Sequence, residues 1–292
     1  MSRPPILRAQ VDRELVVECE RWRDRRDSYR PAGERIDPSA YSVDLVDERT
    51  AKRFVTAHHY SGSYPAARAR VGLFCGRALV GVAVFSVPVN VATVARYSTA
   101  ADGVELGRLV LLDEVPANGE TWFLARAFRA LRIEKPSVGA VVSYSDPVPR
   151  LTAEGALVKP GHLGIIYQAF NALYVGRSRR ETVAIDRAGR VVNRRALSKI
   201  RNDETGAGYA YEQLLAAGAP TRRPLEDGPT YVSRALRDGP FRRFRHPGNH
   251  TYVWTLRRDV AARLPALAFP KPTPAAIPRA NVGAVEAERS VA

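Results

Sequence analysis

The segment from Val71 to Val87, VGLFCGRALVGVAVFSV, contains two apolar runs that are separated by Gly76-Arg77. The runs Val71–Cys75 and Ala78–Val87 are rich in β-branched and aromatic residues, which favour strands. A two-residue connection that contains glycine is typical of a tight hairpin between antiparallel strands. This segment therefore predicts a β-hairpin, and the elements around it decide the class of sheet.

Strands and helices alternate on both sides of the hairpin. Tyr41–Val46 alternates like a strand, and Asp47 is placed to cap a helix that ends near Ala57. The elements expected after the hairpin are a strand at Val104–Leu112, a helix at Glu120–Ile133, a buried strand at Ala140–Tyr144, a helix at Gly164–Asn171, strands at Ala172–Val175 and Thr182–Asp186, helices at Tyr209–Ala217 and Tyr231–Asp238, and a strand at Thr251–Leu256. This order predicts an α/β fold with a mixed, largely antiparallel central sheet flanked by helices, and it resembles the order in GCN5-related acetyltransferases.

The 292 residues suffice for one domain of about 200 residues with extensions at its ends. Residues 1–37 are highly charged, and Val11–Trp22 within them has the pattern of a short amphipathic helix. We expect residues 38–260 to form the folded domain, with a basic C-terminal part. Residues 261–292 are rich in proline and alanine, which predicts a disordered tail.

The composition is that of a soluble globular protein, with 45% hydrophobic and 26% charged residues. No apolar run approaches the roughly 18 residues that a membrane-spanning helix needs, and the N-terminus lacks the apolar core of a secretory signal. The two cysteines, Cys19 and Cys75, lie far apart and suggest neither a disulfide nor a zinc site. We therefore expect a cytoplasmic protein without a membrane partner.

The net charge of +15 is concentrated in two segments. Residues 177–201 contain nine basic and two acidic side chains, and residues 231–258 contain seven basic and one acidic. A GC-rich coding bias explains why most basic residues are arginine and not lysine. It does not explain why basic residues outnumber acidic residues in these two segments. Localised positive charge attracts phosphate backbones, so we predict contact with nucleic acid. The candidate DNA-binding residues are Arg177, Arg179, Arg180, Arg194, Arg195, Lys199, Arg201, Arg242, Arg243 and Arg245.

The run His246-Pro247-Gly248-Asn249-His250 lies in the second basic segment. Two histidines four residues apart can chelate a metal, but the intervening Pro-Gly prevents the helix that would align them. We expect a turn that either faces nucleic acid or is structural.

Three polar runs stand where apolar elements end, and such rims often hold functional groups. The first is His58-His59-Tyr60-Ser61. A neutral imidazole at His59 could serve as a base or a metal ligand. Tyr60 and Ser61 could orient a substrate beside it.

The second run, Ser143-Tyr144-Ser145-Asp146-Pro147, follows a buried strand. A carboxylate at such a strand end can be partly desolvated and tuned as a base or ligand. An Asx-type turn is the alternative for Asp146. Ser143 and Ser145 point to one side of the strand and Tyr144 to the other, so at least one of these candidate substrate contacts must satisfy buried polar groups instead.

The third run places His162 before a helix that carries Tyr167 and Gln168. The amide of Gln168 can pair with an adenine edge, and Tyr167 could stack on a base. An ordinary half-buried helix face is the alternative for both. All three are candidate substrate contacts.

Two further features could bind anions. Arg108 lies within an apolar strand and must find an anion, either Glu105, Asp113 or a bound phosphate or carboxylate. Asn118, Gly119 and Thr121 open a helix whose free amides could cradle a cofactor phosphate. The glycine-rich pattern of coenzyme A loops is absent here, which leaves the donor unknown, with a coenzyme A derivative still open.

These runs, together with Glu105-Leu106-Gly107-Arg108 and Glu120-Thr121-Trp122, resemble the Mom DNA-modification family of bacteriophages over roughly residues 41–255. The resemblance implies an acetyltransferase-like enzyme that converts adenine in double-stranded DNA to its N6-carbamoylmethyl form. The modification protects phage DNA from restriction in the host cytoplasm. The catalytic residues that the resemblance implies are His59, Tyr60, Arg108, Asp146 and Tyr167. It also implies iron, with His59, Tyr60 and Asp146 as ligands.

Two other functions stay open at this point. One is a coenzyme A-dependent N-acyltransferase acting on a small-molecule or protein amine, and the other is a DNA-binding protein without catalysis. Double-stranded DNA is the expected partner, and a homodimer is left open. An enzyme that reaches the adenine amine must flip the base out of the duplex.

Overall fold

The structure is a computed structural model that describes residues 20–23, 26–29, 35–88, 90, 92–159 and 161–271. Its centre is a seven-stranded sheet in the order β10-β13-β7-β6-β5-β4-β3. The strands are β3 (Tyr41–Leu45), β4 (Ala67–Cys75), β5 (Ala78–Ser86), β6 (Gly103–Leu111), β7 (Ala140–Ser145), β10 (Leu173–Arg177) and β13 (His250–Thr255). Only β6 and β7 run parallel, which confirms the prediction of a mixed, largely antiparallel sheet.

The predicted hairpin is formed by β4 and β5, and Gly76 in its turn has φ +57°, a conformation that glycine adopts without steric cost. Alternate residues of β5 face opposite sides of the sheet, as the pleat requires. Ala83 and Phe85 belong to the core under helix α4 (Gly119–Glu134), whereas Val82 and Val84 belong to the core under helix α2 (Glu48–His58).

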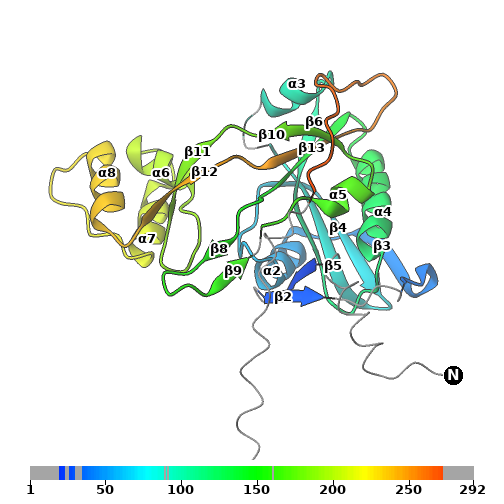
Figure 1. The fold of residues 1–292 in the computed structure, drawn as a ribbon, viewed down its shortest axis with the longest axis horizontal. Helices are drawn as coiled ribbons and strands as arrows, with labels where there is room; N and C mark the ends of the chain where they lie inside the picture. The colour runs from blue at the N-terminus through cyan, green and yellow to red at the C-terminus, as the bar shows by residue number, and fades with distance from the viewer. Residues whose placement is uncertain are drawn as a thin grey trace, which may run out of the picture.

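Helices cover both faces of the sheet (Figure 1). The helices α4 (Gly119–Glu134) and α5 (Ile165–Ala169) pack on one face. The helices α2 (Glu48–His58) and α3 (Ala92–Tyr97) pack on the other. The sheet is therefore the middle layer of three, and side chains at its strand ends can meet residues from both helical layers.

The parallel strands β6 and β7 pair only at their beginnings, from Gly103 opposite Ala140 to Glu105 opposite Val142. Just beyond this pairing, Gly107 forms a bulge in β6, since Leu106 and Arg108 oppose consecutive residues of β5. A side chain at Gly107 would bring its Cβ to 2.5 Å from Ser86 Oγ, so the bulge requires glycine. From this point the two strands separate.

Residues 178–249 lie between the neighbouring strands β10 and β13, and we call them the arm. The arm contains a two-stranded ribbon, β11 (Glu181–Ile185) with β12 (Arg242–His246), and the helices α6 (Arg194–Arg201), α7 (Ala207–Ala216) and α8 (Gly228–Asp238). Figure 1 shows these helices beyond the far end of the ribbon, away from the central sheet. They share a separate apolar core that includes Ile200, Leu214 and Tyr231.

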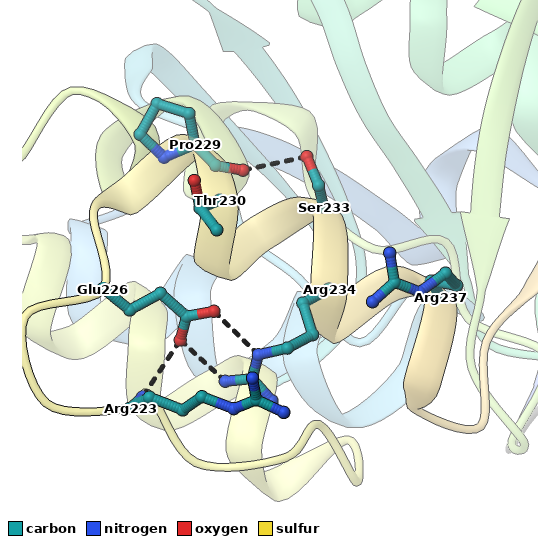
Figure 2. A pocket seen from close by; sticks show the side chains of 7 residues that line it. All are labelled: Arg223, Glu226, Pro229, Thr230, Ser233, Arg234 and Arg237. Atoms are coloured by element: carbon teal, nitrogen blue, oxygen red, sulfur yellow. Dashed lines mark hydrogen bonds and ion pairs between the residues drawn. The ribbon is translucent and has the colours of Figure 1, made fainter.

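A buried ion pair holds the loop before α8 to that helix. The guanidinium of Arg234 donates to both carboxylate oxygens of Glu226 at 2.7 Å, and both side chains are less than 10% exposed. Figure 2 shows the pair beside Arg223 and Arg237 in an open pocket of about 440 Å³. Both charges of the pair are thus satisfied within the arm, and the loss of either partner would leave a buried charge without a counter-charge.

The remaining described elements are two short hairpins and one 3-10 turn. They are β1 (Glu20–Arg23) with β2 (Arg26–Tyr29), β8 (Arg150–Leu151) with β9 (Leu157–Lys159), and η1 (Pro38–Ala40). A helix was expected at Val11–Trp22. Its residues up to position 19 lie outside the described residues, and its last three residues belong to strand β1 and not to a helix.

The chain stays packed beyond the expected domain boundary at residue 260. Arg263 N donates to Tyr97 O at 2.9 Å, and Leu267 N donates to Tyr174 O at 2.8 Å. The tail expected at 261–292 is therefore wrong for residues 261–271, and its remainder lies outside the described residues. Among the residues that the structure describes, no helix is long and apolar enough to span a membrane.

Candidate active site

The first and third polar runs meet around Tyr60, near the ends of the separating strands. The Tyr60 ring lies 4.3 Å from the His59 ring and 6.5 Å from the His162 ring, measured between centroids. Lys159 Nζ lies 5.7 Å from the Tyr60 ring centroid. Residues that are about 100 positions apart in the sequence thus share one cluster.

Arg108, at the bulge of β6, joins the same cluster. Its Nε donates to Ser63 O at 3.0 Å, its Nη2 donates to Ser63 Oγ at 2.8 Å, and its Nη1 donates to Gly107 O. These acceptors carry no charge. Burial lowers the pKa of Arg108, although a guanidinium remains protonated at neutral pH. Of the anions that the sequence offered, Glu105 acts electrostatically on Arg108, and a bound phosphate or carboxylate stays a prediction.

The hydrogen bonds of His59 define its tautomer. Ser61 N donates to His59 Nδ1 at 3.2 Å, and Ser61 Oγ lies 2.9 Å from the same atom. Burial and the nearby charge of Arg108 hold the pKa of His59 well below its usual range. The neutral ring therefore carries its proton on Nε2, and His59 is built as a hydrogen-bond donor toward the site rather than as a base.

Two phenols complete this group of donors. Burial raises the pKa of Tyr60, and burial raises the pKa of Tyr167 to about 12. Both hydroxyls therefore keep their protons at neutral pH. The Tyr167 ring packs edge-on against Tyr252 and Trp254, so the ring belongs to the core, and its hydroxyl interacts with Ser143.

The carboxylate of Asp146 is fully engaged by protein groups. Its Oδ2 lies 2.6 Å from Arg150 Nη2 and 3.2 Å from Lys159 Nζ. Its Oδ1 accepts from Val148 N and from His246 Nε2, both at 2.9 Å. Burial opposes ionisation, but the charges of Lys159 and Arg150 outweigh it and hold the pKa of Asp146 well below its usual range.

This arrangement corrects the roles expected for Asp146. A carboxylate with such a low proton affinity is a poor base, and the bond from Val148 N is the Asx-type turn that the sequence left open. Two cationic groups at Oδ2 also disfavour a metal ion there. Within the described part of the chain, no group of three or more His, Cys, Asp or Glu side chains could hold a metal. The residues present do not fit the expected iron.

Lys159 is a residue of this site that the sequence did not reveal. It is 1% exposed, and its Nζ also donates to Asp146 O and Val148 O. Burial lowers the pKa of Lys159 to about 8. A single lysine before a proline, at the end of the three-residue strand β9, gives no signal in the sequence because so short a strand shows no apolar period.

His162 differs from the other imidazoles of the site, because its ring nitrogens make no hydrogen bond within the described residues. Burial, together with the charge of Lys159, lowers the pKa of His162 to about 3. The ring is therefore neutral at physiological pH and available to a ligand.

The serines of the second run are structural. Ser143 Oγ donates to Leu106 O at 3.0 Å, which links β7 to β6 where they begin to separate. Ser145 is fully buried, and its Oγ has no hydrogen-bond partner among the residues that the structure describes. Tyr144 lies on the opposite face, in a core with Tyr97, and so cannot contact a substrate held by the cluster.

Gln168 is also structural. Its Nε2 donates to Leu163 O at 3.1 Å and to Tyr252 Oη at 3.0 Å. An amide that reads an adenine edge needs its nitrogen free, so the expected role of Gln168 in base recognition is wrong.

The start of α4 does not form the expected phosphate cradle. Gly119 N donates to Pro116 O, and Thr121 Oγ1 donates to Asn118 O. Glu120, in the first turn, is buried and places a negative charge at this helix terminus. Asn118, Gly119 and Thr121 therefore do not fit the pyrophosphate of coenzyme A.

The candidate DNA-binding residues lie on the arm, with Arg177 at its base. All of them are exposed except Lys199, which is half-buried. Arg194 and Arg195 form ion pairs with Glu181 and Glu204. Arg243 and Arg245 oppose Ala184 and Thr182, so they share one face of the ribbon.

The histidine run at the base of the arm is a structural turn. His246 and His250 are buried, and His250 Nδ1 lies 2.9 Å from Tyr174 Oη. The alternative in which this run faces nucleic acid is wrong, because neither imidazole reaches the surface.

The site is thus a mixed sheet that opens between its two parallel strands and carries phenols, imidazoles and a guanidinium at the opening. The model of the Mom protein family matches residues 40–223, which is more than half of the chain. This chain belongs to the Mom protein family.

One curated relative is the methylcarbamoylase Mom of Escherichia phage Mu, which is 29% identical over 138 residues. The match covers 46% of this chain and 53% of the phage protein, so the chain spans about half the length of this relative.

Two solved structures are also similar. A tandem GNAT protein from the clavulanic acid biosynthesis pathway is 8% identical, with a TM-score of 0.37, over 77% of this chain and 99% of that one. A GCN5-related N-acetyltransferase from Kribbella flavida is 12% identical, with a TM-score of 0.29, over 80% of this chain and 59% of that one. Both similarities are too distant to carry an argument about function.

Proposed function

We propose that this protein converts adenine in double-stranded DNA to N6-carbamoylmethyladenine and so protects phage DNA from host restriction enzymes. The relative from phage Mu is named a methylcarbamoylase, and this chain belongs to the same family. The group donor is an activated carbamoylmethyl compound.

The observation that carries the proposal is the convergence of Tyr60, Arg108 and Tyr167 near a basic arm. Tyr60 and Tyr167 each interact electrostatically with Arg108 and with one another. Two phenols and a guanidinium from three separate elements form a set of donors. Such a set stabilises negative charge that develops on a leaving group.

The arm supplies the contact with DNA in this proposal. Exposed arginines such as Arg243 and Arg245 bind backbone phosphates without reading the sequence. The target adenine leaves the duplex and enters the cluster, at a cost of a few kcal/mol. Binding energy from the arm offsets this cost.

In the transfer step, the adenine N6 attacks the methylene carbon of the donor. The bond from that carbon to the leaving group breaks, and the leaving group departs with the electron pair. N6 loses one proton to solvent, and the neutral His162 ring, which makes no hydrogen bond within the described residues, can accept a hydrogen bond from the N6 amine. Arg108, Tyr60 and the Nε2–H group of His59 stabilise the departing anion.

The test is mass spectrometry of nucleosides from a plasmid that is co-expressed with the protein. The expected result is deoxyadenosine that carries one carbamoylmethyl group. Unaltered nucleosides together with intact DNA binding would support a DNA-binding protein without catalysis. Calorimetric binding of coenzyme A without affinity for DNA would support an N-acyltransferase.

A further inference from the structure

A buried hydrogen bond joins the arm to the site. His246, the last residue of β12, places its Nε2 at 2.9 Å from Asp146 Oδ1, and both residues are 8% exposed. The two residues are 100 positions apart in the sequence. The base of the arm and the end of β7 are thus joined directly.

The direction of this hydrogen bond is fixed by the turn that follows β12. Gly248 N donates to His246 Nδ1 at 3.1 Å, so the neutral ring carries its proton on Nε2 and donates to Asp146. Gly248 has φ +94°, and a Cβ there would lie 2.1 Å from Ser178 O. Only glycine allows this turn, and the turn aims the imidazole at Asp146.

The Asp146 carboxylate, which His246 holds in place, in turn binds two residues next to the cluster. Its Oδ2 binds Arg150 and Lys159, and Lys159 Nζ lies beside the Tyr60 ring. A continuous set of contacts therefore runs from the arm through Asp146 and Lys159 to Tyr60.

We propose that His246 is a positioning residue that fixes the Asp146 carboxylate, keeps Lys159 and Arg150 beside Tyr60, and sets the arm relative to the site. This inference rests on the proposed function and deepens it, because DNA held by the arm is then placed at a defined distance from the reacting groups. His246 itself does not touch the substrate.

Three substitutions of His246 distinguish a positioning role from a role in which the side chain only fills space. In His246→Gln the amide nitrogen reaches the place of Nε2 and can still donate to Asp146. In His246→Asn the amide is shorter and reaches only the place of Nδ1. In His246→Leu the volume is kept but the donor is lost.

The first readout is the rate of DNA modification at saturating duplex, with duplex affinity measured by fluorescence anisotropy. We expect His246→Leu and His246→Asn to lower the rate about tenfold or more, because small misplacements of reacting groups have effects of that size. His246→Gln should recover most of the wild-type rate. Affinity should stay unchanged in all three, since the exposed arginines are untouched. Equal rates for the Gln and Leu variants would overturn the proposal.

The second readout needs no activity. The chain has only five lysines, and Lys159 is 1% exposed whereas Lys52 lies on the surface. Reductive methylation mapped by mass spectrometry should label Lys159 several-fold faster in His246→Leu than in the wild type or His246→Gln, relative to Lys52. Unchanged labelling would overturn the positioning role. If labelling follows this expectation but the wild type modifies no DNA, the proposed function fails and the positioning role stands.

Discussion

The hydroxyl of Ser143 donates to the carbonyl oxygen of Leu106 over 3.0 Å, at the point where β6 and β7 separate. In a continuous parallel pair of strands, a backbone amide of the neighbouring strand would donate a hydrogen bond to such a carbonyl. Here the side chain replaces the main-chain bond and holds the diverging strands together without closing the opening.

We predict that Ser143→Ala lowers the free energy of unfolding by about 1–2 kcal/mol, because it leaves a buried carbonyl without a donor. Urea unfolding measures the change. Ser145→Ala is the matched control, since Ser145 is equally buried on the same face and its Oγ donates to no carbonyl oxygen of the described residues. Equal losses in the two variants would contradict this account of Ser143.

Asp146→Asn should destabilise the fold by about 3 kcal/mol or more, because it leaves buried positive charge at Lys159 without a counter-charge. The control is Asp102→Asn, which breaks a more exposed pair with Arg68 and should cost no more than about 1 kcal/mol. Similar unfolding midpoints for both variants would show that the Asp146 network contributes little.

The same network predicts a pH dependence of stability. The pKa of Asp146 is lowered from 3.8, so the unfolded chain binds this proton more readily than the folded chain does. Its contribution to stability is present above pH 3.8 and is lost as the pH falls below that value. Unfolding measured in this acid range should show a smaller loss for Asp146→Asn than for the wild type.

Arg108→Gln should reduce DNA modification by about a hundredfold, as the loss of one preorganised donor does in other enzymes. Nucleoside mass spectrometry over a time course measures it. Arg68→Gln, which changes another strand arginine paired with Asp102, should leave the rate unchanged. A fully active Arg108→Gln variant would remove this residue from the mechanism.

The double variant Arg243→Ala/Arg245→Ala should weaken binding to duplex DNA and reduce the salt dependence of the binding constant by about two charges. The control is Arg132→Ala/Arg258→Ala, which changes two exposed arginines of a pocket at the other end of β13. An equal change in salt dependence for the control would mean that the arm has no special part in DNA binding.

Elements with a clear apolar period could be predicted from the sequence. The helix capped by Asp47 is α2, and the Asp47 side chain accepts from Thr50 N at 2.9 Å. The elements α6 and β12 were not predicted, because RRALSKIR and RRFRH have too few apolar residues to show a period. Tertiary context forms them, through the core of the arm and the pairing with β11.

For the site, the sequence indicated which polar residues stand at the ends of elements, and the structure brings His59, Tyr60 and Arg108 together. It could not show how charged groups pair across the fold. From the sequence, Asp146 was expected to be a free carboxylate. In the structure its oxygens bind Lys159 and His246, which are 13 and 100 positions away in the sequence. Pairing of this kind depends on tertiary distances, which a sequence does not give. For this reason Asp146 was wrongly expected to be a base or a metal ligand.

Ser178 and Asn249 bond to each other through Ser178 N and Asn249 O at 2.8 Å, where the chain leaves β10 and returns to β13. The polypeptide therefore departs and re-enters at a single point, and the two neighbouring strands meet as they would in a simple hairpin. The arm is therefore an insertion between two strands that are neighbours in the sheet. A change in the length or sequence of the arm therefore leaves the strand order of the central sheet unaltered.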